Sequence, residues 1–365
     1  MNASTPWRKP SANAPASPDA ESARDAEQPA TGVAKDAADE SIGRDRLGTI
    51  AVSYPGTYDP HWSGERLIPS RVVIETVFGC NARCAMCVIE EPTDRPKGVM
   101  DMDLYKSIVD RLAPYAANIG IFDLFGLGEP LLDPLLFDRI RYARSKGFRR
   151  LGFATNGHLL TPEKQVGVLE SGIDTVIFSL DGITKETLEG IRPRVSFDRV
   201  MKFCPEIVRR RNEGNYRTRF VVRFTRQQAN SHEWEAFREF WSGVLSPERG
   251  DVVYCYNVHS WSGQVADCAL PDQIPDRRPD IEQMACHHAF EKLVILANGA
   301  VSLCFEDILE AQFGFGNVRD QDPIDVFNSP RFNKIRKLHV DGKKANLKIC
   351  GNCRVLYNEL EREVG

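Results

Sequence analysis

The amino-acid sequence predicts an α/β fold: a partial (β/α)6, TIM-like barrel followed by a small C-terminal α+β domain. Two observations predict it. From Arg71 onward, short β-branched or apolar runs alternate with amphipathic helical stretches, which is typical of a parallel sheet covered by crossover helices. After about Gly263 this alternation stops, and a linker rich in Pro and Asp leads to two short alternating runs. The change of pattern indicates a second domain.

Six runs have the length and composition of strands, and amphipathic stretches of helical period lie between them. The strands are predicted at Val72–Thr76, Ile119–Phe125, Leu151–Thr155, Thr175–Leu180, Phe220–Thr225 and Val252–Asn257. The helices are predicted near residues 102–113, 134–146, 162–171, 196–212 and 231–244. Gly147 and Gly172 follow two of these helices, where a C-terminal cap needs positive φ. Six βα units fit a partial barrel.

The second domain is predicted to begin with a β-hairpin. Asn298-Gly299 lies between the runs Lys292–Ala297 and Ala300–Cys304. This pair predicts a type I′ turn, because that turn needs positive φ at both central residues. A helix is predicted around Arg331–Leu338, and the Cys350–Cys353 knuckle follows it.

Composition sets the domain boundaries. Residues 1–46 are rich in Ala, Asp, Glu, Ser and Pro, and Trp7 is their one aromatic residue. Such a segment buries too little apolar surface to offset the entropy of ordering. We therefore expect a disordered tail over residues 1–46, the barrel over 47–263 and the small domain over 264–365.

The charge balance excludes some classes of partner. The net charge is −4 at neutral pH, which gives no basic footprint for nucleic acid. No apolar run approaches the roughly 20 residues that span a bilayer, and no charged-then-apolar leader opens the chain. We expect a cytoplasmic protein without a nucleic-acid or membrane partner. Arg209, Arg210 and Arg211 are expected on a solvated helix face.

The sequence contains ten cysteines. In a reducing compartment, cysteines are metal ligands or catalysts more often than disulfides.

Three cysteines directly follow the first predicted strand. Cys80, Cys84 and Cys87 form the sequence CNARCAMC, so one loop at the carboxyl edge of the sheet supplies all three thiolates. Thiolates are soft ligands suited to iron–sulfur clusters, and three of them leave the fourth iron of a cubane open for a substrate or cofactor. The spacing alone leaves two alternatives: zinc with a distant fourth ligand, and reactive thiols without a metal.

Three further motifs stand at the ends of the next strands. They are Gly126-Leu127-Gly128-Glu129-Pro130, Thr155-Asn156-Gly157 and Ser179-Leu180-Asp181-Gly182. Together with CxxxCxxC after the first strand, this set resembles the radical S-adenosylmethionine (SAM) superfamily. The resemblance implies that the three cysteines hold a 4Fe–4S cluster whose open iron binds SAM.

Several residues acquire expected roles from this resemblance. Gly126, Gly128 and Glu129 belong to the segment that contacts the amino group of the methionine moiety of SAM, and glycines let the backbone approach a ligand closely. Asn156 and Ser179 stand at strand ends that face the cofactor, although either residue can instead cap a helix.

Two more positions are assigned in the same way. Arg223, on the fifth predicted strand, resembles the residue that pairs with the carboxylate of the cofactor. Met86 departs from the family pattern, because the residue before the third cluster cysteine is usually aromatic and packs near the adenine. A thioether fills the same apolar space, so we expect Met86 to line the adenine site.

A second cysteine group lies toward the end of the sequence: Cys286, Cys304, Cys350 and Cys353. Four cysteines with a CxxC pair satisfy tetrahedral zinc as well as an iron–sulfur cluster, so the residues alone leave both open. Beside a radical SAM motif, the group resembles the auxiliary-cluster domain called SPASM, in its shortened form called twitch. That form implies one auxiliary 4Fe–4S cluster without an open iron, which serves electron transfer and structural support.

The resemblance implies that a 5′-deoxyadenosyl radical takes a hydrogen atom from the substrate. An external one-electron reductant of the flavodoxin or ferredoxin type is expected to deliver the electron that reduces the first cluster. One outcome is oxidation of a carbinol, with the auxiliary cluster as electron acceptor. This outcome resembles the twitch-type dehydrogenases of aminoglycoside biosynthesis, a pathway of antibiotic production, and implies a small polar substrate: an aminoglycoside, an aminocyclitol or a sugar.

The other outcome is epimerisation, in which a cysteine outside both clusters returns a hydrogen atom. Cys204, Cys255 and Cys268 remain for this role. Cys255 is the candidate catalytic residue, because the end of the sixth predicted strand is expected to open on the substrate cavity; its alternative is a small buried hydrophobe. His259 and Trp261 are expected to line the same cavity.

Two other classes of protein stay open. A zinc-stabilised binding module would explain the second cysteine group, but it leaves CNARCAMC and the glycine-rich motif without a purpose. A radical enzyme that modifies a peptide would keep both clusters, but it requires a peptide-binding surface. We recognise no peptide-recognition domain before residue 70, which favours a small-molecule substrate.

Overall fold

The computed structural model describes residues 62–259, 261–265, 268–273 and 277–360. The predicted tail over residues 1–46 lies outside these ranges. Among the helices within them, none combines the length and the hydropathy of a bilayer-spanning segment.

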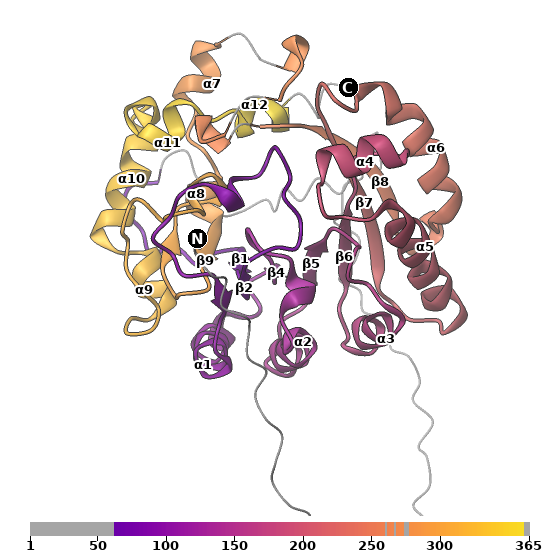
Figure 1. The fold of residues 1–365 in the computed structure, drawn as a ribbon. Helices are drawn as coiled ribbons and strands as arrows, with labels where there is room; N and C mark the ends of the chain where they lie inside the picture. The colour runs from indigo at the N-terminus through magenta and orange to yellow at the C-terminus, as the bar shows by residue number, and fades with distance from the viewer. Residues whose placement is uncertain (1–61, 260, 266–267, 274–276, 361–365) are drawn as a thin grey trace, which may run out of the picture. The chain divides into compact units, whose positions relative to one another are not determined.

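One eight-stranded sheet organises the described residues, in the order β10-β9-β1-β4-β5-β6-β7-β8 (Figure 1). Its barrel strands are β1 (Arg71–Ile74), β4 (Ile121–Asp123), β5 (Leu151–Thr155), β6 (Thr175–Ser179), β7 (Arg219–Arg226) and β8 (Val252–Asn257). Each pairs in parallel with the next. The six predicted strands and the partial-barrel fold class are therefore confirmed, although the second strand is shorter than predicted.

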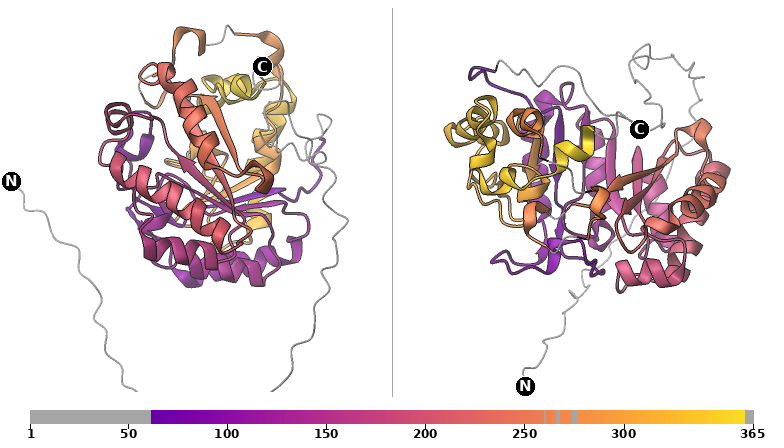
Figure 2. Two further views of the ribbon diagram at one scale, coloured as in Figure 1. Left: turned by 90° about the vertical axis from the view of Figure 1, so that its right-hand side faces the viewer. Right: turned by 90° about the horizontal axis from the view of Figure 1, so that it is seen from above.

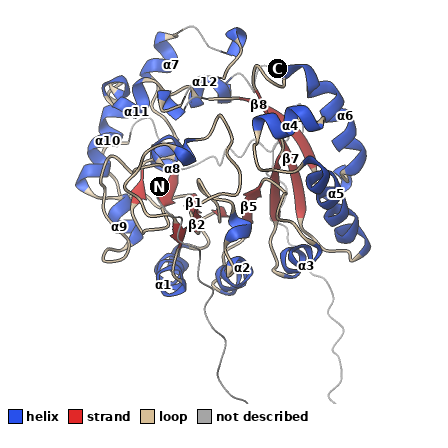
Figure 3. Cartoon of the chain, in the orientation of Figure 1, coloured by secondary structure: helices blue, strands red, loops and turns tan. Residues whose placement is uncertain are grey.

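Helices cover the outer side of these strands (Figure 3). They are α1 (Met102–Leu112), α2 (Leu136–Ser145), α3 (Pro162–Glu170), α4 (Lys185–Ile191), α5 (Phe197–Glu213) and α6 (Trp234–Val244). Five of them match the predicted helices, and α4 was missed. It has seven residues and buries only Leu188 and Ile191, which is too little for a periodic pattern to be visible.

The arginines near the end of α5 do not share one environment. Arg209 forms an exposed ion pair with Glu213, whereas Arg211 is fully buried and pairs with the buried Asp251. The prediction of a solvated face is therefore wrong for Arg211. Successive helical residues point about 100° apart, so a run of three residues reaches both the solvent and the core.

A separate two-stranded sheet closes the cysteine loop. β2 (Val77–Phe78) pairs antiparallel with β3 (Gly98–Val99). The two ends of the loop formed by residues 79–97 therefore lie next to each other. This sheet is not predictable from the sequence, because a two-residue strand is too short to show alternation of apolar and polar residues. Its consequence is that the loop carrying the first cysteine group is anchored at both ends.

The C-terminal domain continues the sheet of the barrel. β9 (Lys292–Ile295) pairs in parallel with β1, from Arg71 opposite Lys292 to Ile74 opposite Ile295. β10 (Val301–Ser302) then pairs antiparallel with β9. The ladder thus crosses the predicted domain boundary between residues 263 and 264.

The predicted hairpin is confirmed, but its predicted turn type is wrong. Gly299 has a φ of 86°, whereas Asn298 is not among the described residues with positive φ. The turn is instead closed by the N–H of Gly299, which donates to the oxygen of Leu296 at 2.8 Å. A Cβ atom on Gly299 would lie 2.5 Å from Oδ1 of Asn317, so both the backbone and the packing require glycine here.

Short helices complete the C-terminal domain. They are α7 (Pro279–Gln283), α8 (His288–Glu291), α9 (Pro323–Phe327), α10 (Pro330–Val340), α11 (Lys348–Gly351) and α12 (Val355–Leu360). α10 confirms the predicted helix around 331–338. Figures 1 and 2 show α9 to α11 on the side of the sheet away from α5 and α6.

A buried carboxylate joins three parts of the fold. Glu75, directly after β1, accepts the N–H of Leu127 at 3.2 Å and the N–H of Ala297 at 3.0 Å. It also forms a buried ion pair with Arg95, which donates to the oxygen of Ile308 at 2.7 Å. One side chain therefore ties the first barrel strand to the glycine-rich motif, to the cysteine loop and to the C-terminal domain.

Candidate active site

A cavity of about 420 Å³ lies at the carboxyl ends of the barrel strands, where clefts form in parallel α/β folds. Both predicted cysteine groups line it: Cys80, Cys84, Cys87, Cys286, Cys304, Cys350 and Cys353. The predicted cofactor contacts that line it are Met86, Gly126, Glu129, Asn156, Ser179 and Arg223. Two cysteine groups that lie about 200 residues apart in the sequence thus line the same cavity.

Polar groups surround the three cysteines of the first loop. Cys80 Sγ accepts the N–H of Ala82 at 3.4 Å, and Nδ2 of Asn156 lies 3.9 Å from the same sulfur. Cys84 Sγ accepts from Nη1 of Arg192 at 3.6 Å. Donors directed at sulfur are suited to thiolates rather than to neutral thiols.

Burial shapes the acidity of these thiols. It raises the pKa of Cys80 to about 11, with a further contribution from the charge of Glu129, and it raises the pKa of Cys87 to about 12. Three thiolates in this loop therefore need a cationic centre among them, because metal binding deprotonates a ligating thiol. A thiolate-bound iron cluster satisfies that requirement.

The glycine-rich motif packs tightly against the start of the cysteine loop. A Cβ atom on Gly128 would lie 2.0 Å from the oxygen of Val77, and one on Gly126 would lie 2.6 Å from Cγ of Glu75. The N–H of Glu129 donates to the oxygen of Gly79 at 3.0 Å. Only glycines allow this approach, so the motif keeps its backbone beside the cluster loop.

The buried Glu129 organises two strand ends. Its carboxylate accepts the N–H of Asn156 at 2.8 Å and that of Leu131 at 3.2 Å. Asn156 in turn donates from Nδ2 to Oδ1 of Asn81 at 3.0 Å, within the cysteine loop. Asn156 therefore does not cap a helix; it links the end of β5 to the loop that carries the first cysteine group.

Ser179 and Arg223 are direct neighbours across β6 and β7. Nη2 of Arg223 donates to Oγ of Ser179 at 2.5 Å, and the guanidinium lies 5.6 Å from the ring centroid of Tyr256. Nε of Arg223 is buried without a hydrogen-bond partner among the described residues. A guanidinium with an unused donor at the cavity wall is suited to a ligand carboxylate.

Met86 belongs to a small apolar cluster at the other side of the loop. It packs with Ile191, Val258 and Ala269, and Cys268 packs against the same cluster. This apolar surface beside the first cysteine group suits the face of an aromatic ring, as expected for the adenine site.

The structure contradicts one expectation about β8. Tyr254 and Tyr256 line the cavity, whereas Val253 and Cys255 pack against the main hydrophobic cluster. Successive residues of a strand point to opposite faces, so the Cys255 side chain turns away from the cavity. The expectation that it opens on the cavity is wrong. Cys204 is fully buried in the same cluster.

The second cysteine group comes from three segments: Cys286 precedes α8, Cys304 follows β10, and Cys350 and Cys353 belong to α11 and the turn after it. Burial raises the pKa of Cys286 to about 11, and it also raises the pKa values of Cys304, Cys350 and Cys353. The charges of other cysteines in the group raise the pKa values of Cys304, Cys350 and Cys353 further. Four half-buried cysteines that line one cavity offer the four thiolates of a coordinatively closed site.

Arg192 is a site residue that the sequence does not predict. It forms an ion pair with the buried Asp181 at 2.5 Å while it donates to Cys84 Sγ. Asp181 belongs to the strand-end motif after β6, but Arg192 follows α4, a helix that was itself not predicted. A lone arginine after a short helix carries no sequence signal.

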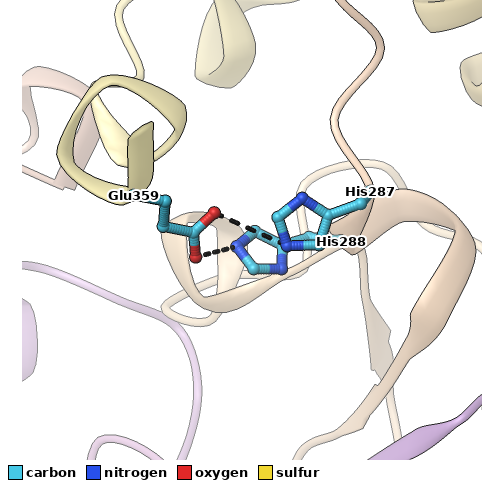
Figure 4. Close-up of side chains that lie close together, drawn as sticks. All are labelled: His287, His288 and Glu359. Atoms are coloured by element: carbon cyan, nitrogen blue, oxygen red, sulfur yellow. Dashed lines mark ion pairs between the residues drawn. The ribbon is translucent and has the colours of Figure 1, made fainter. Parts of the chain in front are cut away.

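A network of two histidines and a glutamate stands beside Cys286. Figure 4 shows the carboxylate of Glu359 facing both imidazole rings: Nε2 of His288 lies 3.0 Å and Nε2 of His287 3.5 Å from its oxygens. Nζ of Lys292 lies 3.4 Å from the same nitrogen of His288. An ammonium group there competes with a metal cation, since like charges repel. Burial lowers the pKa of His288 to about 3. We therefore describe His288, Glu359 and Lys292 as a polar network in the cavity wall.

Comparison with known families identifies the class of protein. Residues 74–221 match the model of the radical SAM superfamily, and residues 286–354 match the model of the iron–sulfur cluster-binding domain called SPASM. The fold and the site thus define an iron–sulfur enzyme that uses SAM. The chain belongs to the radical SAM superfamily and carries a C-terminal SPASM-type domain.

Two curated proteins are similar to this chain in sequence. The cofactor-modifying protein of tungsten-containing aldehyde ferredoxin oxidoreductase from Pyrococcus furiosus is 26% identical over 298 residues, which is 72% of this chain and 82% of that protein. The AdoMet-dependent heme synthase of Methanosarcina barkeri is 35% identical over 124 residues, and the match spans 34% of each chain. The latter likeness covers only about a third of the relative.

Solved structures share the fold. BtrN in complex with AdoMet and 2-DOIA has a TM-score of 0.53 at 20% identity, covering 79% of this chain and 94% of that chain. Streptococcus suis SuiB bound to precursor peptide SuiA has a TM-score of 0.54 at 17% identity, covering 74% of this chain and 67% of that chain. At these identities the likeness establishes the architecture.

Two 4Fe–4S clusters and SAM are therefore the cofactors of this enzyme, and the residues present fit them. The first loop offers three thiolates, as a cluster with an open iron requires, and the second group offers four. The unused donor of Arg223 and the apolar surface at Met86 are suited to the carboxylate and the adenine of SAM.

Proposed function

We propose that this enzyme oxidises a carbinol of a small polar substrate, an aminoglycoside, an aminocyclitol or a sugar, and that the auxiliary cluster accepts an electron in the process. One observation carries the proposal: a single cavity of about 420 Å³ is lined by both cysteine groups. A substrate held between them lies within reach of a radical source on one side and an electron acceptor on the other.

The proposed reaction balances as follows. When bound, SAM and the first cluster supply the radical that takes the carbinol hydrogen atom, and the auxiliary cluster takes up one electron. The hydroxyl proton goes to a base and a C=O bond forms. His259 is our candidate for that base, because it lines the cavity and its Nδ1 lies 2.9 Å from Oε1 of the buried Glu306.

Oxidation is favoured over epimerisation by the placement of the thiols. Every cysteine among the described lining residues belongs to one of the two cluster groups. Cys255, the predicted hydrogen donor, packs on the opposite face of β8. A donor for epimerisation needs direct access to the substrate radical, so this position argues against that role.

A small polar substrate is supported by the cavity wall. Tyr254, Tyr256, Thr225 and Asn358 contribute hydroxyl and amide groups to the lining. A polyhydroxylated molecule can exchange its water contacts for these groups. The likeness to BtrN, solved with AdoMet and 2-DOIA, points to the same class, whereas the likeness to SuiB, solved with a precursor peptide, makes a peptide the competing class.

The test uses the full-length chain, reconstituted anaerobically with iron and sulfide and reduced by dithionite or by a flavodoxin system. It is incubated in D₂O with SAM and 2-deoxy-scyllo-inosamine, and the products are weighed by mass spectrometry. We expect 5′-deoxyadenosine together with a product two mass units lighter than the substrate. A product one unit heavier indicates epimerisation and contradicts the proposal, as does modification of a peptide while aminocyclitols and sugars stay unchanged.

Replacing one auxiliary ligand separates the two halves of the reaction. In Cys350→Ala we expect 5′-deoxyadenosine to form while the yield of the oxidised product falls at least tenfold, because the electron has no acceptor. An unchanged yield of oxidised product would show that the auxiliary cluster is not the acceptor.

A further inference from the structure

A buried histidine bridges two members of the second cysteine group. His339 lies on α10, and only 1% of its surface is exposed. Its Nδ1 accepts the backbone N–H of Cys286 at 3.1 Å, and its Nε2 lies 3.5 Å from Sγ of Cys350. Both ring nitrogens are thus engaged with cluster ligands.

These two contacts fix the position of the ring proton. A backbone N–H can only donate, so Nδ1 of His339 must present its lone pair to Cys286. The neutral imidazole then carries its hydrogen on Nε2, which faces Cys350. The contact with Sγ is therefore an N–H···S hydrogen bond in which the thiolate accepts.

No other imidazole in the described ranges has a hydrogen bond to the sulfur of a cluster cysteine. Cys353 Sγ accepts the backbone N–H of Val355 at 3.4 Å, and Cys84, in the first group, faces the guanidinium of Arg192. A substitution of His339 thus changes the donor set of one sulfur and leaves the contacts of the first group in place.

We propose that His339 raises the reduction potential of the auxiliary cluster through its hydrogen bond to Cys350. A donor directed at a ligating sulfur withdraws electron density from the metal, and this stabilises the reduced cluster more than the oxidised one. His339 acts through a ligand and is a positioning residue. The consequence rests on the proposed function: a higher potential makes the cluster a better acceptor for the electron that leaves the substrate.

Two substitutions separate this role from a structural one. His339→Gln places an amide N–H near the position of Nε2 and keeps a donor for Cys350, but it loses the acceptor for Cys286. His339→Asn places its amide near Nδ1, so it keeps an acceptor for Cys286 and loses the donor. A residue that only supports the backbone at Cys286 would be replaced better by Asn than by Gln.

The experiment is a potentiometric titration of the full-length enzyme with both clusters, followed by electron paramagnetic resonance. The signal of the first cluster is recognised by its change on addition of SAM, and the remaining signal reports the auxiliary cluster. We expect the midpoint potential of the auxiliary cluster to shift to a more negative value in His339→Asn and to stay at the wild-type value in His339→Gln. Iron content is measured for every sample.

Three results would overturn the proposal: an unchanged potential in His339→Asn, equal negative shifts in both variants, or equal loss of auxiliary iron from both. The measurement needs no substrate. It therefore stands apart from the proposed function, which fails instead if the wild-type enzyme does not oxidise an aminocyclitol or a sugar.

Discussion

The indole nitrogen of Trp261 donates a hydrogen bond of 2.7 Å to the backbone oxygen of Met86, inside the loop that carries the first cysteine group. The next residue, Ser262, donates to the carboxylate of Glu306 at 3.1 Å, beside the second group. Trp261 and Ser262 both have positive φ, at 50° and 58°, which is costly for residues with a side chain. The two hydrogen bonds hold this strained segment between the clusters.

Removing the indole donor should loosen the SAM site. A hydrogen bond of this kind contributes about 0.5–1.5 kcal/mol, so we expect Trp261→Phe to raise the half-saturating SAM concentration about two- to tenfold. The rate of 5′-deoxyadenosine formation is measured against SAM concentration. Trp62→Phe is the matched control, because its indole donates to the oxygen of Glu65 at 2.9 Å, outside the cavity lining. Equal effects in both variants would count against a local role.

Loss of one thiolate from the first loop should abolish SAM cleavage. In Cys80→Ala we expect 5′-deoxyadenosine to fall to background and the iron content to fall by about half, since one of two 4Fe–4S clusters is lost. Cys204→Ala is the control, because that thiol is fully buried in the hydrophobic core. It should keep its iron and lose only about 1 kcal/mol of stability through the smaller side chain. Undiminished iron in Cys80→Ala would refute the assignment.

The unused donor of Arg223 should bind the carboxylate of SAM. Replacement by glutamine removes a charge-assisted pair worth about 1.5–3 kcal/mol, so we expect the half-saturating SAM concentration to rise at least tenfold. Arg226→Gln is the control, since Arg226 lies on the same strand but pairs at the surface with Asp272 at 2.8 Å. A Ser179→Ala variant should show a smaller effect. SAM binding as tight in Arg223→Gln as in the wild type would contradict the carboxylate-binding role of Arg223.

The buried pair of Glu75 and Arg95 should support the fold more than any exposed pair does. Burial raises the pKa of Glu75 even though Arg95 opposes the shift. In Glu75→Gln the guanidinium stays buried without a counter-charge, which costs about 3–5 kcal/mol. Urea unfolding measures the loss. Asp325→Asn, which breaks the exposed pair with Arg66, should change the unfolding free energy by less than about 1 kcal/mol.

The thiol of Cys255 should be dispensable. Because its side chain packs on the far face of β8, we expect Cys255→Ser to convert substrate within about twofold of the wild-type rate. Product analysis in D₂O accompanies the rate measurement. A variant that cleaves SAM but no longer completes turnover would restore the hydrogen-donor role and the epimerase alternative.

The parts of the fold and site that could be predicted from the sequence are those that repeat or cluster. Six strands and five helices were found because their apolar residues recur with a fixed period over at least five positions. Both cysteine groups were found because thiols at fixed spacings are uncommon outside metal sites and redox sites. The cavity that joins the two groups follows from neither pattern.

The rest depends on relationships that a local pattern does not contain. The pairing of β9 with β1 joins residues more than 200 positions apart, and the sequence between them does not specify a partner. The orientation of Cys255 is decided by a single step of strand register, which reverses the face that a side chain points to. Arg192 and His339 are single polar residues whose partners become visible only in three dimensions.

The parallel pairing of β9 with β1 has a consequence for how electrons move. The loop with the first cysteine group follows β1, and Cys304 of the second group follows β10 of the same sheet. The hydrogen-bonded pairing of β9 with β1 resists sliding and bending where the two domains meet. The distance between the two cysteine groups is then held by hydrogen bonds between strands, and we expect it to stay constant while molecules enter and leave. We expect the rate of turnover to be set by the arrival of the reductant and by substrate binding. We expect no opening and closing of the barrel against the C-terminal domain.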